Sequence, residues 1–294
     1  MKRRQRRPPA GARLRGAVAL LRPRQWIKNS FVLAPLVFAG EFRDPAAIRQ
    51  ALSAAALFCV GSSAAYIVND ILDRESDRRH PVKSRSRPLA SGALGVPTAV
   101  ALLAALYGTL LAAAFQVPRV ALVIAAYLAL NLAYSFALKH QPVVDIFSIA
   151  SGFVLRVYAG AVALGVTLSG WMFVTTLSLA LYLAAIKRRQ ELLLTSGRGR
   201  SVLARYSLDL VDRYAAMSAT AALLFYALYV ISTRPAMVAT IPIVLFGMFR
   251  YWYIVDRHGQ GESPTDAVLA DWPLQVTLLA WLATTIWALS PGQP

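Results

Sequence analysis

Long apolar runs separated by short polar segments make up most of this chain of 294 residues. The runs are rich in Leu, Ala and Val, and they lack the strict alternation that a membrane-spanning strand would show. Most of them approach or exceed the roughly 20 residues that a helix needs to cross a bilayer. The pattern predicts an all-α membrane protein with nine transmembrane helices, over residues 25–40, 49–69, 96–116, 119–137, 143–164, 168–186, 214–232, 236–254 and 273–290.

The composition supports the same fold class. Hydrophobic residues make up 57% of the chain and charged residues only 15%, whereas a soluble domain carries about 25% charged residues. The single cysteine, Cys59, lies inside an apolar run and excludes a disulfide framework. We expect one transmembrane domain over residues 25–290, preceded by a basic arm, residues 1–24, that is disordered or lies at the membrane interface.

Lys and Arg fall unevenly on the two sides of the predicted helices. With the N-terminus inside, 26 of the 31 basic residues lie in the arm and the inner loops, and four lie in the outer loops. This bias is the positive-inside signal of an integral protein of the inner or plasma membrane. The net charge of +17 therefore indicates topology and not nucleic-acid binding. Twelve of the fourteen acidic residues also lie inside, which favours a cavity and an active site on the cytoplasmic side.

Four oxygen-bearing side chains occur at the inner end of the second predicted span, in the sequence NDILDRESD. If the helix continues past Val68, the carboxylates of Asp70, Asp73 and Asp77 fall within about 60° of one another. The amide of Asn69 widens this arc to about 100°. Carboxylates this close repel one another unless a cation lies between them. Because oxygen ligands suit Mg²⁺ and no His or Cys joins the group, the spacing predicts a Mg²⁺ site rather than a zinc site.

Three basic residues, Lys83, Arg85 and Arg87, follow the acids within a short segment bounded by prolines. Arg binds phosphate through two parallel hydrogen bonds, and Lys acts as a mobile point charge. Acids beside bases suit a metal-bound diphosphate, because the bases can take the phosphate oxygens that the metal leaves free. The alternative is a solvated loop that sets topology, in which acids pair with neighbouring arginines for about 0–1 kcal/mol each.

A second polar group surrounds the inner end of the fourth predicted span. Lys139 and Asp145 lie at this boundary, and Asp145 is a candidate for a second metal ligand or a substrate contact. Arg156 follows about 16 Å further along an ideal helix, at a depth where a charge needs a cavity or a partner. It can bind a buried phosphate or pair with an acid of a neighbouring span. Gly152 and Gly160 permit close helix packing around it.

Four other residues are candidate substrate contacts. Tyr66 and Tyr134 each precede an Asp at an inner membrane boundary. Lys187 can point toward a substrate phosphate, or it can form a helical pair with Glu191 one turn later. Lys28 follows a tryptophan, so it can bind a lipid phosphate or serve as an ordinary interfacial anchor.

The motif NDxxDxxxD at the end of a second span resembles the first motif of the UbiA-type intramembrane transferase superfamily, a likeness that extends over about residues 20–290. The segments LRPRQWIKN, YSFALKHQPVVDIFSIASGFVLR and KRRQEL are similar to its decaprenyl-phosphate phosphoribosyltransferase branch. That branch transfers ribose 5-phosphate from phosphoribosyl diphosphate (PRPP) to a polyprenyl phosphate for cell-envelope glycans, and it needs Mg²⁺. The resemblance implies nine helices around a cavity that opens to the cytoplasm.

The resemblance also implies roles for the candidate residues. The metal would be held by Asn69, Asp70, Asp73 and Asp77. Catalysis would depend on Asp73, Asp77, Lys83 and Arg87. Substrate contacts would come from Lys28, Tyr66, Arg85, Tyr134, Lys139, Asp145, Arg156 and Lys187. The step from Lys83 to Arg87 is longer than this branch usually has, so which base takes which phosphate is open.

Two other functions stay open at this point. The same acid motif would serve a prenyltransferase that moves a prenyl group from a prenyl diphosphate to an aromatic or other acceptor. A transporter or lipid-binding scaffold would instead place polar groups near the middle of the bilayer, where Arg156 is the clear example here. The sequence also leaves a homo-oligomer open.

Overall fold

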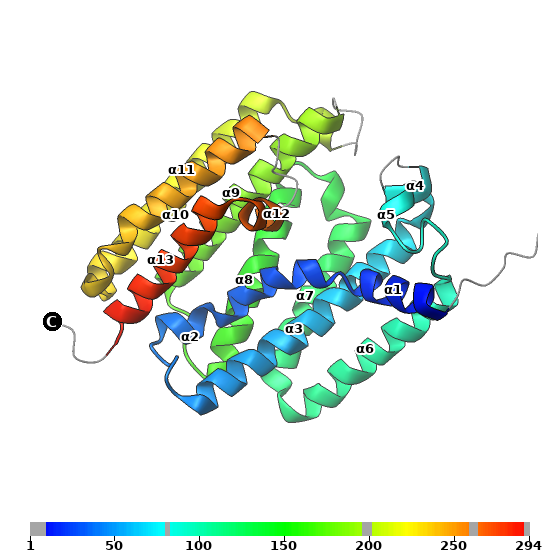
Figure 1. Cartoon of the computed structure of the whole chain (residues 1–294), viewed down its shortest axis with the longest axis horizontal. Coiled ribbons are helices and arrows are strands. Elements are labelled where there is room, and N and C mark those ends of the chain that lie inside the picture. Colours follow the sequence, from blue (N-terminus) through cyan, green and yellow to red (C-terminus); the bar gives the residue numbers. More distant parts are fainter. Residues whose placement is uncertain (1–9, 80–82, 196–201, 259–263, 291–294) are drawn as a thin grey trace, which may run out of the picture.

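Every regular element that the computed structural model describes is a helix, over residues 10–79, 83–195, 202–258 and 264–290 (Figure 1). The helices are α1 (Ala10–Leu21), η1 (Pro23–Leu33), α2 (Ala34–Phe38), α3 (Pro45–Leu72), α4 (Arg74–Arg79), α5 (Lys83–Ser86), α6 (Val96–Gln116), α7 (Pro118–Phe136), η2 (Leu138–His140), α8 (Val144–Leu164), α9 (Gly170–Thr195), η3 (Leu203–Arg205), α10 (Leu208–Thr233), η4 (Pro235–Met237), α11 (Thr240–His258), α12 (Pro264–Ala270) and α13 (Trp272–Ala288). In this described part, six helices are long and apolar enough to cross a membrane: α3, α6, α7, α8, α9 and α10.

The six spans follow the predicted ones closely. α6 covers the predicted residues 96–116, and α7 and α8 lie within one residue of their predicted bounds. α9 and α10 extend beyond their apolar runs, to Thr195 and from Leu208, because Leu, Lys, Arg and Glu favour continuation of a helix. α11 and α13 overlap the eighth and ninth predicted spans but are not among the six.

Prolines and capping side chains set several helix starts. Asp44 accepts two backbone N–H groups, at 2.9 and 3.2 Å, just before Pro45 opens α3. Ser207 and Asp271 cap α10 and α13, each by accepting the N–H of the residue three positions later. Such caps satisfy N–H groups that have no partner within the helix.

The first predicted span, residues 25–40, does not form a single α-helix in the structure. It forms the 3-10 helix η1 and the five-residue helix α2 instead. Asn29 and Val32 of η1 are buried, and η1 contacts both α3 and α8. Packing against α3 and α8 at once overrides the preference of the apolar run for one α-helix. A 3-10 helix has three residues per turn, so it directs side chains at other angles than an α-helix does.

Residues 10–21 of the predicted arm form α1, so this part is helical rather than disordered. Leu20 is buried in a cluster with Ile67 of α3. Leu14 and Val18 face outward, with 69% and 48% of their surface exposed. A helix with exposed apolar side chains beside a membrane domain suits an interfacial position.

α3 and α8 lie at the centre of the helical array, and α6 lies at its edge (Figure 1). Half of the spanning window is buried in α3 and in α8, compared with 6% in α6. α9 packs along α8 and α10, and α11 packs along α13, so these later helices form the other side of the array. η1 contacts α3 and α8 at the centre of the array, and it also contacts α12.

α8 and η1 approach each other so closely that a side chain does not fit between them. A Cβ atom at Gly160 would lie 1.9 Å from the carbonyl oxygen of Val32. The predicted close packing at Gly160 is confirmed. At Gly152 the nearest atoms would lie 3.5 Å away, which is an ordinary contact distance, so this position does not require glycine.

Gly160→Ala should destabilise the protein by about 2 kcal/mol, because the added methyl group forces α8 away from the η1 backbone. The measurement is the thermal unfolding midpoint of the purified protein in detergent. Gly108→Ala is the matched control, since a Cβ there meets no atom within 4 Å. Equal midpoints for the two variants would contradict the close approach of α8 and η1.

Candidate active site

The joint between α3 and α4 carries the predicted acid cluster. Asp73 donates its backbone N–H to the Asn69 carbonyl, and Asp77 donates to the Asp73 carbonyl, both at 2.8 Å. Helical hydrogen bonding therefore continues past Val68 and through the joint, although α3 itself ends at Leu72. Asp70 and Asp77 are buried, whereas the Asp73 side chain is 44% exposed.

Two arginines from different segments bind the same oxygen of Asp70. Arg22, between α1 and η1, and Arg87, which follows α5, both donate to Asp70 Oδ1. The Arg22 guanidinium also lies over the Tyr66 ring, 4.8 Å from its centroid. Asp70 is 2% exposed, and the two arginine side chains are 21% and 26% exposed. These pairs are shielded from water, unlike the surface pairs expected of a purely topological loop.

The second predicted group reaches the first through Lys139 of η2. Its Nζ lies 3.3 Å from Asp73 Oδ1. Ser135, near the end of α7, donates its hydroxyl to Asn69 Oδ1. The structure therefore brings residues from the ends of α3 and α7 together at the α3–α4 joint.

Asp145 is fully buried within an ion-pair network. Arg188, also fully buried, places Nε 2.6 Å from Asp145 Oδ2, and Tyr206 donates its hydroxyl to Oδ1 at 2.7 Å. Arg188 further donates to the Tyr134 hydroxyl at 2.8 Å and pairs with Glu191. Asp145 Oδ1 thus accepts a hydrogen bond, whereas Oδ2 is paired with Arg188 by charge and accepts no hydrogen bond from the described residues.

Tyr206 also holds the turn that leads into α8. Its hydroxyl accepts the backbone N–H of Val143 at 2.6 Å. Val143 has a φ of 67°, a left-handed conformation that is rare for a β-branched residue. Burial raises the pKa of Tyr206, so the phenol stays protonated and continues to donate to Asp145.

Arg156 is 4% exposed and has no acidic partner among the residues described. Its guanidinium donates to Asn29 Oδ1 at 2.9 Å, to the Gly152 carbonyl at 2.7 Å and to the Tyr127 hydroxyl at 3.0 Å. Aromatic rings surround it, with centroids 4.8–5.2 Å from its central carbon. Neutral acceptors and ring faces therefore stabilise this charge without cancelling it. Of the two predicted alternatives, the pair with an acid is not found in the described part.

Several cations lie within electrostatic range of one another. Lys28 is half-buried; Lys187, Arg156 and Arg22 repel its charge, and Asp266 of α12 attracts it. Like charges gathered in a partly desolvated place are unfavourable unless anions join them. Asp266 supplies one such anion to this group.

The predicted bases after the acid motif have different positions. The Lys83 side chain lies outside the described residues, although its backbone begins α5. Arg85 is exposed. Among the contacts that the structure describes, Arg87 is the one of the three that binds an acid.

The acid cluster is not a preformed metal cage. In the part of the chain that is described, no three His, Cys, Asp or Glu side chains gather closely enough to hold a metal ion. The chemistry of the predicted ligands still fits Mg²⁺, because all of the donors are oxygen atoms. Asp70 Oδ2 is buried and accepts no hydrogen bond from the described residues, so it can take a cation.

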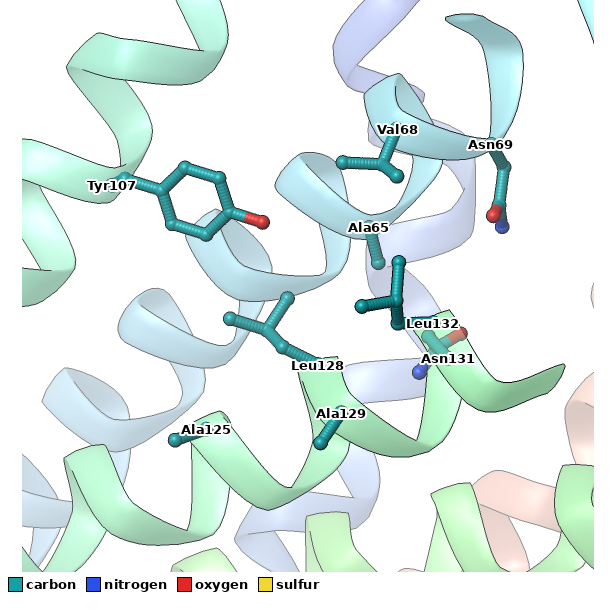
Figure 2. A pocket seen from close by; sticks show the side chains of 9 residues that line it. All are labelled: Ala65, Val68, Asn69, Tyr107, Ala125, Leu128, Ala129, Asn131 and Leu132. Atoms are coloured by element: carbon teal, nitrogen blue, oxygen red, sulfur yellow. The ribbon is translucent and has the colours of Figure 1, made fainter. Parts of the chain in front are cut away.

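A cavity of about 220 Å³ adjoins Asn69 between α3, α6 and α7. Figure 2 shows Asn69 and Asn131 at one end of the cavity and Tyr107 at the other. An apolar cavity beside a polar cluster suits a ligand with a hydrocarbon part. The apolar lining consists of Ala65, Val68, Ala125, Leu128, Ala129 and Leu132.

Three residues that sequence reasoning did not select are central to these contacts: Arg22, Asn29 and Arg188. Arg22 and Asn29 lie in the same segment as the predicted Lys28, and Arg188 follows Lys187. Arg188 lies four residues after the buried Ala184, and so on the same helical face. That burial is a property of the fold, so no local signal in the sequence marked these three residues.

Comparisons with known proteins agree with this architecture. The family model described as "UbiA prenyltransferase family" matches residues 30–274. The chain is 38% identical over 290 residues to a decaprenyl-phosphate phosphoribosyltransferase from Corynebacterium glutamicum, covering 93% of this chain and 86% of that protein. It is 37% identical over 298 residues to one from Mycobacterium tuberculosis, covering 97% of each.

Solved structures share the fold at low identity. A UbiA homolog from Archaeoglobus fulgidus bound to GPP and Mg²⁺ matches with a TM-score of 0.69 and 19% identity, covering 93% of this chain and 99% of that one. The predicted all-helical UbiA-type fold is therefore confirmed, and its long apolar helices make this an integral membrane protein. Because the family model spans most of the chain and its relatives match nearly all of it, the protein belongs to the UbiA prenyltransferase family.

Proposed function

We propose that this protein transfers a 5-phosphoribosyl group from PRPP to a polyprenyl phosphate and releases diphosphate. The proposal is carried by two neighbouring groups of ion pairs. Asp70 is bound by Arg22 and Arg87, and Asp73 pairs with Lys139 beside them. Acids and bases gathered at one point suit a metal-bound diphosphate as the leaving group. The likeness of nearly the whole chain to proteins named decaprenyl-phosphate phosphoribosyltransferase supports PRPP as the donor.

The bases at the α3–α4 joint would hold the leaving group. Arg87 and Lys139, with Lys83, would bind the diphosphate oxygens and stabilise the charge that grows there as the bond to the anomeric carbon breaks. That carbon then develops oxocarbenium character. A Mg²⁺ ion, when bound, neutralises further charge on the diphosphate. The residues that would hold it are Asn69, Asp70, Asp73 and Asp77.

The cations near η1 would hold the acceptor. Lys28, Lys187 and Arg156 would position the lipid phosphate so that its oxygen bonds to the anomeric carbon. A phosphate monoester has a second pKa of about 6, so it is largely ionised at pH 7 and needs no general base. Catalysis then consists of positioning and electrostatics. The apolar cavity beside Asn69 supports a lipid acceptor.

The proposed topology places this chemistry on the cytoplasmic side. The distribution of Lys and Arg supports an inside N-terminus. η1 with α2, α11 and α13 would join the six apolar helices to complete nine membrane elements. They would form one catalytic domain over residues 25–290, with its cavity open to the cytoplasm.

Purified protein with Mg²⁺ should convert labelled PRPP and a polyprenyl phosphate into labelled lipid. The readout is radioactivity in the organic phase, with EDTA as the control that removes the metal. Formation of product from a prenyl diphosphate and an aromatic acid, without labelled lipid from PRPP, would contradict the proposal in favour of prenyl transfer. Turnover of neither pair would favour a non-enzymatic scaffold.

Asp73→Asn should lower kcat at least about 100-fold, because it removes a charged oxygen that faces the diphosphate. Glu75→Gln is the matched control, since Glu75 lies on the same joint, is 71% exposed and pairs only weakly with Arg78 at 3.2 Å. The control should retain the activity of the unmodified protein. Full turnover by Asp73→Asn would refute the assigned role of this acid.

A further inference from the structure

Arg22 binds Asp70 from a backbone position that is held independently of this ion pair. Ser63 of α3 accepts a hydrogen bond from Trp26 Nε1 at 3.0 Å and donates its own to the Leu21 carbonyl at 2.9 Å. These bonds fix the chain on both sides of Arg22. They also account for its left-handed backbone, with a φ of 54°, since such a conformation persists where surrounding contacts determine it.

The Arg22 side chain can therefore move while its backbone stays in place. Its contacts are the shared oxygen of Asp70 and the ring of Tyr66, 4.8 Å away. It is 21% exposed, so it borders solvent as well as the buried carboxylate. Rotation about its side-chain bonds would be enough to change partner.

A cation that binds Asp70 must compete with Arg22 and Arg87. Both guanidinium groups contact Oδ1, and a divalent ion at the same carboxylate would lie close enough to repel them strongly. Displaced guanidinium groups need new anionic partners. Phosphate oxygens are the partners that match their paired N–H donors best.

We infer that Arg22 is an exchangeable counter-ion of Asp70. It neutralises this buried carboxylate until a divalent cation arrives with a diphosphate, and then it moves from Asp70 to the diphosphate oxygens. The inference rests on the proposed function only for the identity of the diphosphate. It makes cation and donor binding cooperative, because the donor supplies the partner that Arg22 needs when it leaves Asp70.

The test measures binding of Mn²⁺, an oxygen-seeking substitute for Mg²⁺, to the full-length protein in detergent without substrate. Free Mn²⁺ is followed by electron paramagnetic resonance. Arg22→Gln should bind Mn²⁺ about tenfold more tightly, because one competing ion pair is gone. At saturating Mn²⁺, the same variant should bind PRPP about tenfold more weakly, since a phosphate ligand is lost. Arg24→Gln is the matched control, because Arg24 is exposed on the same segment, and neither affinity should change.

Tighter Mn²⁺ binding together with weaker PRPP binding distinguishes exchange of Arg22 between partners from a purely structural role of this residue. Unchanged or weaker Mn²⁺ binding by Arg22→Gln would overturn the inference, and so would unchanged PRPP binding. Where Arg22→Gln does not fold, Arg87→Gln takes its place in the Mn²⁺ titration, with the same sign expected and the same result overturning the inference. The Mn²⁺ titration needs no turnover, so its result can be read separately from a failure of phosphoribosyl transfer.

Discussion

The placement of charge away from water is the constraint on which the rest of this structure depends. A buried charge without a partner costs several kcal/mol, and the described residues include several buried charges. Asp70 is bound by Arg22 and Arg87, and Asp145 is bound by Arg188. Arg156 differs, since neutral acceptors and aromatic rings surround it and no acid among the described residues pairs with it.

These ion pairs also position the helices around the candidate site. Arg188 connects α9 to Asp145 at the start of α8 and to Tyr134 of α7. The next residue, Arg189, connects α9 to Asp212 of α10 and Asp256 of α11. Consecutive arginines on one helix therefore join the ends of four other helices. A rigid frame of this kind suits a reaction that depends on positioning and electrostatics rather than on proton transfer.

The sequence was sufficient for the features that depend on local pattern. The bounds of α6, α7 and α8 follow from apolar runs with prolines or polar residues at their ends, and helical hydrogen bonding continues past Val68 as far as Asp77. The first predicted span does not form a single α-helix because η1 adapts to two neighbouring helices, which no local pattern shows.

Pairings between distant segments were beyond sequence reasoning for the same reason. Asp70 meets Arg22 across 48 residues, and Arg156 meets Asn29 across 127. The sequence marked Asp145 as a candidate ligand because it lies at a membrane boundary, and the fold adds a buried ion pair with Arg188 that the sequence does not show. Residue type and spacing predicted that charged side chains gather at the inner ends of the spans. Only the fold determines which acid pairs with which base.

A structure of the protein with Mg²⁺ and PRPP, determined by cryo-electron microscopy, tests the central claim most directly. The account predicts the diphosphate at the α3–α4 joint, with the cation on Asp70 and with the guanidinium groups of Arg22 and Arg87 moved onto phosphate oxygens. A diphosphate bound elsewhere, with both arginines still on Asp70, would contradict it.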